Sequence, residues 1–181
     1  KMSGVQRWAG IYRIIDDGLD AGTEAWAREV GPDGIRLTSV INRFDDEEYE
    51  EALEITLDPD WTPNEIHIER TSEDGSRRYI GRRVGDAWIS QLFRESGRMR
   101  TVTLPFGEQM HVDYLTAHTN SVTIQRLGLL PETGEEIDVV YIDPDTYAPS
   151  EVRQKYARLA DPAPFEIAGT QVTRGYAYQG A

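Results

Sequence analysis

The sequence predicts a mainly β protein: a large antiparallel curved sheet or open β-barrel with one or two short helices. Short segments rich in Ile, Val, Thr and Tyr recur along the 181 residues, and turn-forming dipeptides such as Asp-Gly, Pro-Asp and Thr-Gly separate them. No low-complexity linker divides the chain, so we expect a single domain over residues 1–181. This many strands in one domain favour strong curvature, which reduces exposed edges and leaves an interior.

The first eight expected strands follow one another through short connections. Their expected bounds are Arg7–Ile14, Thr23–Glu29, Ile35–Asn42, Glu50–Leu57, Glu65–Thr71, Ser76–Val84, Ala87–Arg94 and Met99–Thr103. Asp33-Gly34 and Asp74-Gly75 have the residue types that tight hairpin turns require.

Further strands are expected beyond residue 110, together with one helical segment. The expected strands are Val112–Thr116, Ser121–Leu127, Glu136–Ile142, Phe165–Ile167 and one within Thr170–Tyr178. A short helix or turn is expected around Ser150–Leu159, directly after Pro149.

Polar side chains interrupt these later strands at alternating positions. Because residues two apart in a strand share a face, His111 and Asp113 point the same way, and so do Ile124 and Arg126. If these side chains and Tyr141 face inward, an imidazole, a carboxylate, a guanidinium and a phenol meet in one interior. The pattern therefore predicts a lined cavity open to solvent.

Several short motifs resemble those of the putative glycolipid-binding family. They are His111-Val112-Asp113, Thr119-Asn120, Ile124-Gln125-Arg126-Leu127, Glu136-Ile137-Asp138-Val139-Val140-Tyr141 and Gln154-Lys155-Tyr156, and nearer the N-terminus Gly22-Thr23-Glu24, Asp58-Pro59-Asp60-Trp61-Thr62 and Gly85-Asp86-Ala87-Trp88. The resemblance spans residues 20–160 and is densest after His111.

The resemblance implies an open barrel similar to that of bacterial lipoprotein carriers and a binding role. It also implies that Glu24, Tyr141, Gln154 and Tyr156 are polar groups of the cavity. The chain departs from the family pattern at three positions: His111 replaces an acid, Thr123 replaces proline and Gln125 replaces a second basic residue.

The composition excludes several classes of partner and site. With 32 acidic and 19 basic residues the net charge is −13, which repels phosphate backbones and anionic headgroups, so neither nucleic acid nor stable binding to anionic membranes is expected. Cysteine is absent, which excludes disulfides and thiolate chemistry. With neither the ~18–20-residue apolar run that spans a bilayer nor the apolar core of a secretory signal, the chain is expected to be cytoplasmic.

The strongest candidate pair is Asp113 with Arg126. It is either a structural ion pair between strands or a site in which Arg126 anchors a ligand carbonyl, phosphate or carboxylate. His111 beside Asp113 forms half of a general-base arrangement, while His118 is either a ligand contact or a loop histidine with one backbone hydrogen bond. The spacing of the histidines, with His67 in another strand, matches no metal motif, so no metal is expected. The sequence contains neither a GxxxxGK(S/T) loop nor a strand-linked GxGxxG motif, so no cofactor is expected.

The leading hypothesis is binding of a small or medium amphipathic molecule, such as a lipid, glycolipid, isoprenoid or polyketide-like compound. Apolar walls hold its hydrocarbon part while polar groups meet its head. The expected ligand-binding residues are Arg126, Asn120, Glu24, Trp26, Tyr114, Tyr156, Gln154 and His118.

Two alternatives stay open. In the first, the protein is a cofactor-independent acid–base enzyme (isomerase, cyclase, lyase or hydrolase) in which His111, Asp113 and Tyr141 act on a hydrophobic substrate. In the second, the polar interior is wholly structural and the protein is an interaction module. The sequence leaves a homodimer open.

Overall fold

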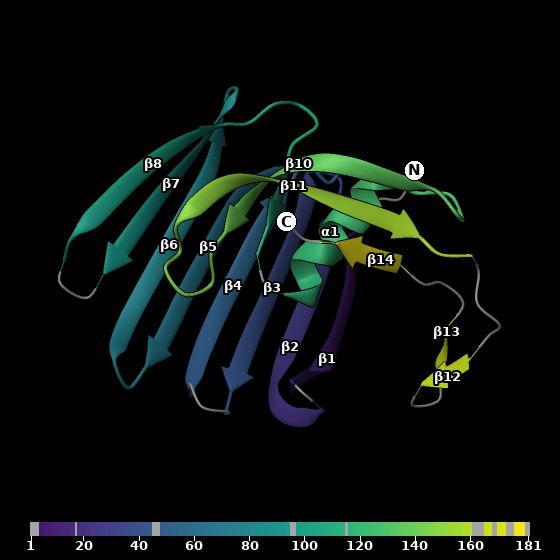
Figure 1. Ribbon diagram of the computed structural model, residues 1–181, viewed down its shortest axis with the longest axis horizontal. Helices are drawn as coiled ribbons and strands as arrows, with labels where there is room; N and C mark the ends of the chain where they lie inside the picture. The colour runs from purple at the N-terminus through teal and green to yellow at the C-terminus, as the bar shows by residue number, and fades with distance from the viewer. Residues whose placement is uncertain are drawn as a thin grey trace.

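The computed structural model describes residues 4–16, 18–44, 48–94, 97–114, 116–160, 165–167, 170–172 and 176–179 (Figure 1). Its largest element is an antiparallel sheet of eight strands in chain order. They are β1 Gln6–Asp16, β2 Leu19–Gly31, β3 Gly34–Arg43, β4 Tyr49–Leu57, β5 Pro63–Ser72, β6 Gly75–Val84, β7 Ala87–Arg94 and β8 Met99–Pro105. β1 and β8 are the two edges, so the sheet is curved and open rather than closed. The expected fold class and the first eight expected strands are confirmed.

Tight turns set the register of this meander. Gly31 pairs with Gly34 across the β2–β3 turn, and Ser72 pairs with Gly75 across the β5–β6 turn. Gly34 has a φ of 142°, and a Cβ there would lie 2.5 Å from the carbonyl oxygen of Leu57. Only glycine fits this position, because it tolerates both the dihedral angle and the close approach of β4.

One face of the large sheet forms the core. On β3, Ile35, Leu37, Ser39 and Ile41 are buried and alternate with more exposed residues, and β4 and β5 show the same period of two. The buried side chains of β3 to β7 form a continuous cluster that includes Tyr79 and Trp88.

A second layer covers this face (Figure 1). It consists of β9 His111–Asp113, helix α1 Ala117–Leu127, β10 Gly134–Ile142, β11 Pro149–Arg158 and β14 Tyr176–Gln179, with the strands ordered β14-β11-β10-β9. β9 and β10 are parallel because α1 forms the crossover between them. Later in the sequence, β12 Phe165–Ile167 and β13 Thr170–Val172 form a separate two-stranded sheet.

The structure corrects the strand expected at Ser121–Leu127, which belongs to α1. Thr116 is the N-cap and its hydroxyl accepts a hydrogen bond from the Thr119 amide, while Gly128 ends the helix in the left-handed conformation. Residues two apart in a helix point to nearly opposite sides, so Ile124 and Arg126 do not share a face as the strand pattern suggested. In the described part of the chain, no helix has the length and apolar content to cross a bilayer.

The helix expected around Ser150–Leu159 is also wrong, because this segment is β11. It pairs with β10 from Pro149 opposite Ile142 to Ala157 opposite Gly134. Gln154 and Tyr156 are buried, whereas the intervening Lys155 is exposed, which is strand periodicity.

Candidate functional site

A buried carboxylate on β4 organises the core beside the candidate site. The side chain of Glu51 is 1% exposed and accepts hydrogen bonds from Arg70 Nε at 2.8 Å, from the Tyr114 hydroxyl at 2.7 Å and from the Tyr147 hydroxyl at 2.8 Å. Arg70 also donates to the Tyr114 hydroxyl at 3.2 Å and lies 3.9 Å from the centre of the Tyr49 ring. The buried negative charge is thus both paired and hydrogen-bonded.

The protonation states of this network are stable. Burial and the Glu51 carboxylate raise the pKa values of Tyr114 and Tyr147 well above the usual range of a phenol, so both hydroxyls remain donors. Burial alone would lower the pKa of Arg70, but the Glu51 carboxylate outweighs burial and the net change is upward.

The loop between β10 and β11 holds Tyr147 over the large sheet. The Asp143 carboxylate accepts hydrogen bonds from the Asp145 amide and from both the amide and the hydroxyl of Thr146. These bonds lower the pKa of Asp143 and close the loop into a tight turn. Tyr147 follows with a φ of 57° and is buried against Tyr79.

Next to Tyr147, charged residues form a row across four strands. In the strand register, Glu51 is directly opposite Arg70, Arg70 is opposite Arg77, and Arg77 is opposite Arg94. Directly paired residues share a face, and this is the core face because Glu51 and Arg70 are buried. The row therefore begins in the core and ends at two exposed guanidinium groups.

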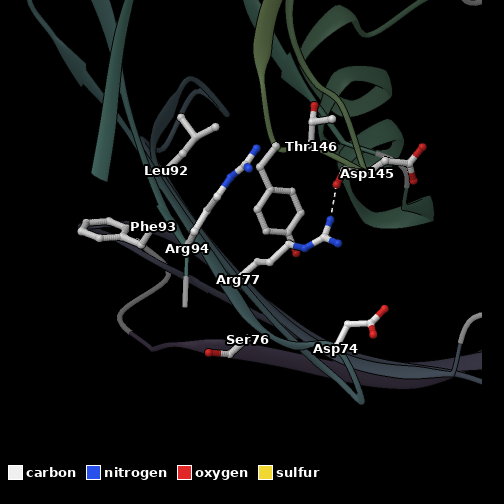
Figure 2. Close-up of a pocket in the computed structure, with 9 residues that line it drawn as sticks. Asp74, Ser76, Arg77, Leu92, Phe93, Arg94, Asp145 and Thr146 are labelled. Atoms are coloured by element: carbon white, nitrogen blue, oxygen red, sulfur yellow. Dashed lines mark hydrogen bonds between the residues drawn. The ribbon is translucent and has the colours of Figure 1, made fainter. Parts of the chain in front are cut away.

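A pocket of about 460 Å³ opens at the exposed end of this row. Figure 2 shows Arg77 below the loop that carries Asp145 and Thr146, Arg94 beside this loop, and Phe93 pointing away from both arginines. Arg77 Nη1 donates to the backbone carbonyl of Asp145, which joins the two layers. We call this space the rim pocket; it is lined by Asp74, Ser76, Arg77, Leu92, Phe93, Arg94, Asp145, Thr146 and Tyr147.

Three of the residues predicted from the sequence meet elsewhere, between α1 and the large sheet. The Ser39 hydroxyl donates to Glu24 Oε1 at 2.7 Å and lies 3.1 Å from His118 Nδ1, and this nitrogen is 3.7 Å from the same carboxylate oxygen. The Trp26 ring meets the His118 ring edge to face at 5.5 Å. Burial, followed by the Glu24 carboxylate, raises the pKa of Tyr12, which stacks on Trp26.

Four others meet between α1 and the smaller sheet. Gln154 Nε2 donates to Asp113 Oδ2 at 2.7 Å, and the Thr119 hydroxyl lies 3.1 Å from Asp113 Oδ1. The Tyr156 hydroxyl donates to Asn120 Oδ1 at 2.7 Å and lies 3.3 Å from Gln154 Oε1. These side chains satisfy one another's hydrogen-bonding groups, so the network attaches α1 to the smaller sheet.

Arg126 and His111 do not form the arrangement expected with Asp113. Instead of the expected ion pair, Arg126 donates to the backbone carbonyls of Met110, at 2.6 Å, and Glu108. His111 is buried, and burial together with the positive charge of Arg126 lowers its pKa to about 3. A general base is most effective with a pKa near the working pH, so the neutral His111 ring is a poor proton acceptor. Tyr141 is opposite Asp113 in the β9–β10 ladder, and its pKa is raised by burial and by Asp143.

The residues of the rim pocket were not predicted from the sequence. The hairpin turns nevertheless contained the information needed to align the arginines of the pocket. Once Ser72 faces Gly75 and Val84 faces Ala87, counting back along the strands places Arg70, Arg77 and Arg94 in one row.

Comparisons with known proteins agree with this fold. The model of a family described as putative glycolipid-binding matches residues 17–171, and membership of that family indicates a binding role. A crystal structure of a DUF1089 family protein from Pseudomonas aeruginosa superposes with a TM-score of 0.59 at 22% identity, covering 96% of this chain and 82% of that one. At this identity the likeness concerns the fold alone. No curated protein matches the sequence.

Proposed function

We propose that this chain, which belongs to the putative glycolipid-binding family, binds one small or medium amphipathic molecule in the rim pocket. Lipids, glycolipids, isoprenoids and polyketide-like compounds all have the required division into an apolar and a polar part. The apolar part would lie on Leu92 and Tyr147, and the head would lie between Arg77 and Arg94.

The observation that carries this proposal is the shape and lining of the rim pocket. Its volume of about 460 Å³ lies within the roughly 300–1,000 Å³ of known ligand pockets. Leu92 belongs to the core cluster, so the floor of the pocket continues the hydrophobic core, while Arg77 and Arg94 add two guanidinium groups to its lining. A molecule with one apolar and one polar end matches this division.

The space between the two layers is a weaker candidate, although the sequence predicted a ligand there. A void lined by Ile55, Ile66, Val112 and Val122, among others, has a volume of about 10 Å³, which is at the limit of what one water molecule needs, ~10–15 Å³. Side chains of α1 and β9 fill this part of the interior. A ligand in the rim pocket needs no displacement of the helix.

The acid–base enzyme is less well supported than the binding protein. Its proposed base, His111, is neutral and only weakly basic at physiological pH, and Asp113 is engaged by Thr119 and Gln154. We therefore propose the binding function alone.

Filling the pocket tests this function. 1-Anilinonaphthalene-8-sulfonate, an environment-sensitive amphipathic fluorophore, should bind the wild type saturably. Thr146→Trp places an indole at the mouth of the pocket and should weaken binding by about tenfold or more, equivalent to ~1.4 kcal/mol.

The matched control is Thr133→Trp. Thr133 is also an exposed loop residue whose hydroxyl bonds within its own turn, to the Leu130 carbonyl, and it does not line the rim pocket. Its affinity should stay within about twofold of the wild type. Equal affinities for the two folded variants would refute the assignment of binding to this pocket.

A further inference from the structure

We infer that the polar head of the ligand carries one anionic group (a phosphate, sulfate or carboxylate) that Arg77 and Arg94 hold together. This inference rests on the proposed binding of an amphipathic molecule in the rim pocket and specifies its chemical class.

The two arginines occupy positions where their charges repel each other. Arg77 and Arg94 are directly opposite on β6 and β7, where Cβ atoms are about 4.5–5.5 Å apart and like charges are destabilising. Arg70 precedes them in the same row but is neutralised by Glu51. Among the described residues, no carboxylate forms an ion pair with Arg77 or Arg94.

Other arginines of the protein provide a contrast. With 32 acidic and 19 basic residues, carboxylates are abundant, and many arginines outside the core are paired with one. These ion pairs are Arg7–Glu29, Arg13–Asp20, Arg36–Glu54, Arg82–Glu65, Arg83–Asp58 and Arg153–Asp138.

Arg77 and Arg94 differ from these ion-paired arginines, and unlike Arg78, Arg98 and Arg100, which also have no ion pair among the described residues, they line the rim pocket. Within the described part of the chain, Arg94 has no side-chain hydrogen bond or ion pair, and Arg77 donates only to a backbone carbonyl. Two guanidinium groups with free donors on one face are a recurrent way of binding a planar or tetrahedral oxyanion.

The carboxylates of the pocket limit where the ligand can be negative. Asp74 and Asp145 both line it, and they would repel a ligand that is anionic along its whole length. The charge must therefore be confined to the group between Arg77 and Arg94. The rest of the head must be neutral, and hydroxyl groups there could donate to Asp74.

The experiment compares two single-chain amphiphiles below their critical micelle concentrations by isothermal titration calorimetry: dodecyl phosphate and its neutral dimethyl ester. The wild type should bind dodecyl phosphate about tenfold or more tightly than the ester. Arg94→Gln should remove this preference, because its affinity for dodecyl phosphate falls to about that for the ester. The preference should also weaken as salt is added.

Arg100→Gln is the matched control. Arg100 is directly opposite Leu92 in the β7–β8 ladder, so its side chain leaves the same face of the sheet as Leu92 and Arg94. It does not line the rim pocket. This variant should keep the preference of the wild type. Inorganic phosphate forms a third arm and should bind far more weakly than dodecyl phosphate, because it lacks the chain.

The outcomes separate the inference from the proposed function. Equal binding of the phosphate and the ester by wild type would overturn the anionic head and leave the amphipathic ligand standing. A preference that survives in Arg94→Gln would overturn the role of the arginines. Failure of both amphiphiles to bind would overturn the proposed function, and binding of inorganic phosphate as tight as that of dodecyl phosphate would show an anion site without an apolar subsite.

Discussion

Replacing Arg70 by methionine should strongly destabilise the protein. Glu51 is 1% exposed and its partner Arg70 is 8% exposed, so Arg70→Met leaves a carboxylate that water cannot reach. The hydroxyls of Tyr114 and Tyr147 still donate to it, but they do not neutralise its charge. Breaking one partner of a buried ion pair costs about 3–5 kcal/mol.

Urea unfolding gives the measurement. With a slope of about 2 kcal/mol per M, the expected loss moves the unfolding midpoint down by about 1.5–2.5 M. The double variant Arg70→Met/Glu51→Met should be more stable than Arg70→Met alone, because it removes the stranded charge as well.

Arg36→Met is the control, since Arg36 donates to Glu54 from the exposed side of the sheet. Both side chains of that pair are about half exposed, 54% and 41%, and an exposed ion pair contributes about 1 kcal/mol or less. A loss at Arg70 as small as that at Arg36 would mean that water reaches Glu51. That result would refute the claim that Glu51 depends on Arg70 for neutralisation in the core.

Three further predictions concern other parts of the fold. The His111 ring should stay neutral down to about pH 3 when its titration is followed by NMR. In the unfolded chain the ring takes up a proton near pH 6.5, so the free energy of unfolding should fall as the pH drops from about 6.5 towards 3. This fall should be smaller in His111→Gln. Gly81→Ala would place a Cβ 2.6 Å from the Trp88 ring and should cost about 1–3 kcal/mol in thermal unfolding, whereas Gly107→Ala, with open space around it, should change stability by less than about 0.5 kcal/mol. Thr116→Ala removes the N-cap of α1 and should cost about 1 kcal/mol in the same assay; no measurable change would mean that the cap does not hold the helix.

The eight-stranded sheet was predictable because its information is local. Each strand pairs with the next through a short turn, so alternation and turn residues were sufficient. The helix α1 was missed because its β-branched residues, such as Thr123 and Ile124, favour strands. The signals that decided its fold were the caps Thr116 and Gly128, and partners on both sides of the helix outweighed its intrinsic preference.

The candidate site was less predictable than the fold. Glu24, Trp26 and His118 do lie together, but nothing in the sequence places residue 118 beside residue 24 until α1 is known to cross the large sheet. The pair Arg77 and Arg94 was predictable from strand register. It was not recognised, because two arginines in exposed strand ends resemble ordinary surface charge.

Arg77 and Arg94 have a second possible role, which is to keep this part of the sheet soluble. The sign of their charge distinguishes this role from ligand binding. The core face of β6 to β8 extends beyond the covering layer, and polar side chains there would keep the exposed end of the face soluble, as they do at other sheet edges. Carboxylates would serve this purpose equally well, and one beside Arg77 would pair with it. Yet Arg77 and Arg94 lie directly opposite each other on this face, in a chain whose net charge is −13. Solvation alone therefore explains the polarity of this end of the face but not its sign, whereas an anionic ligand explains both.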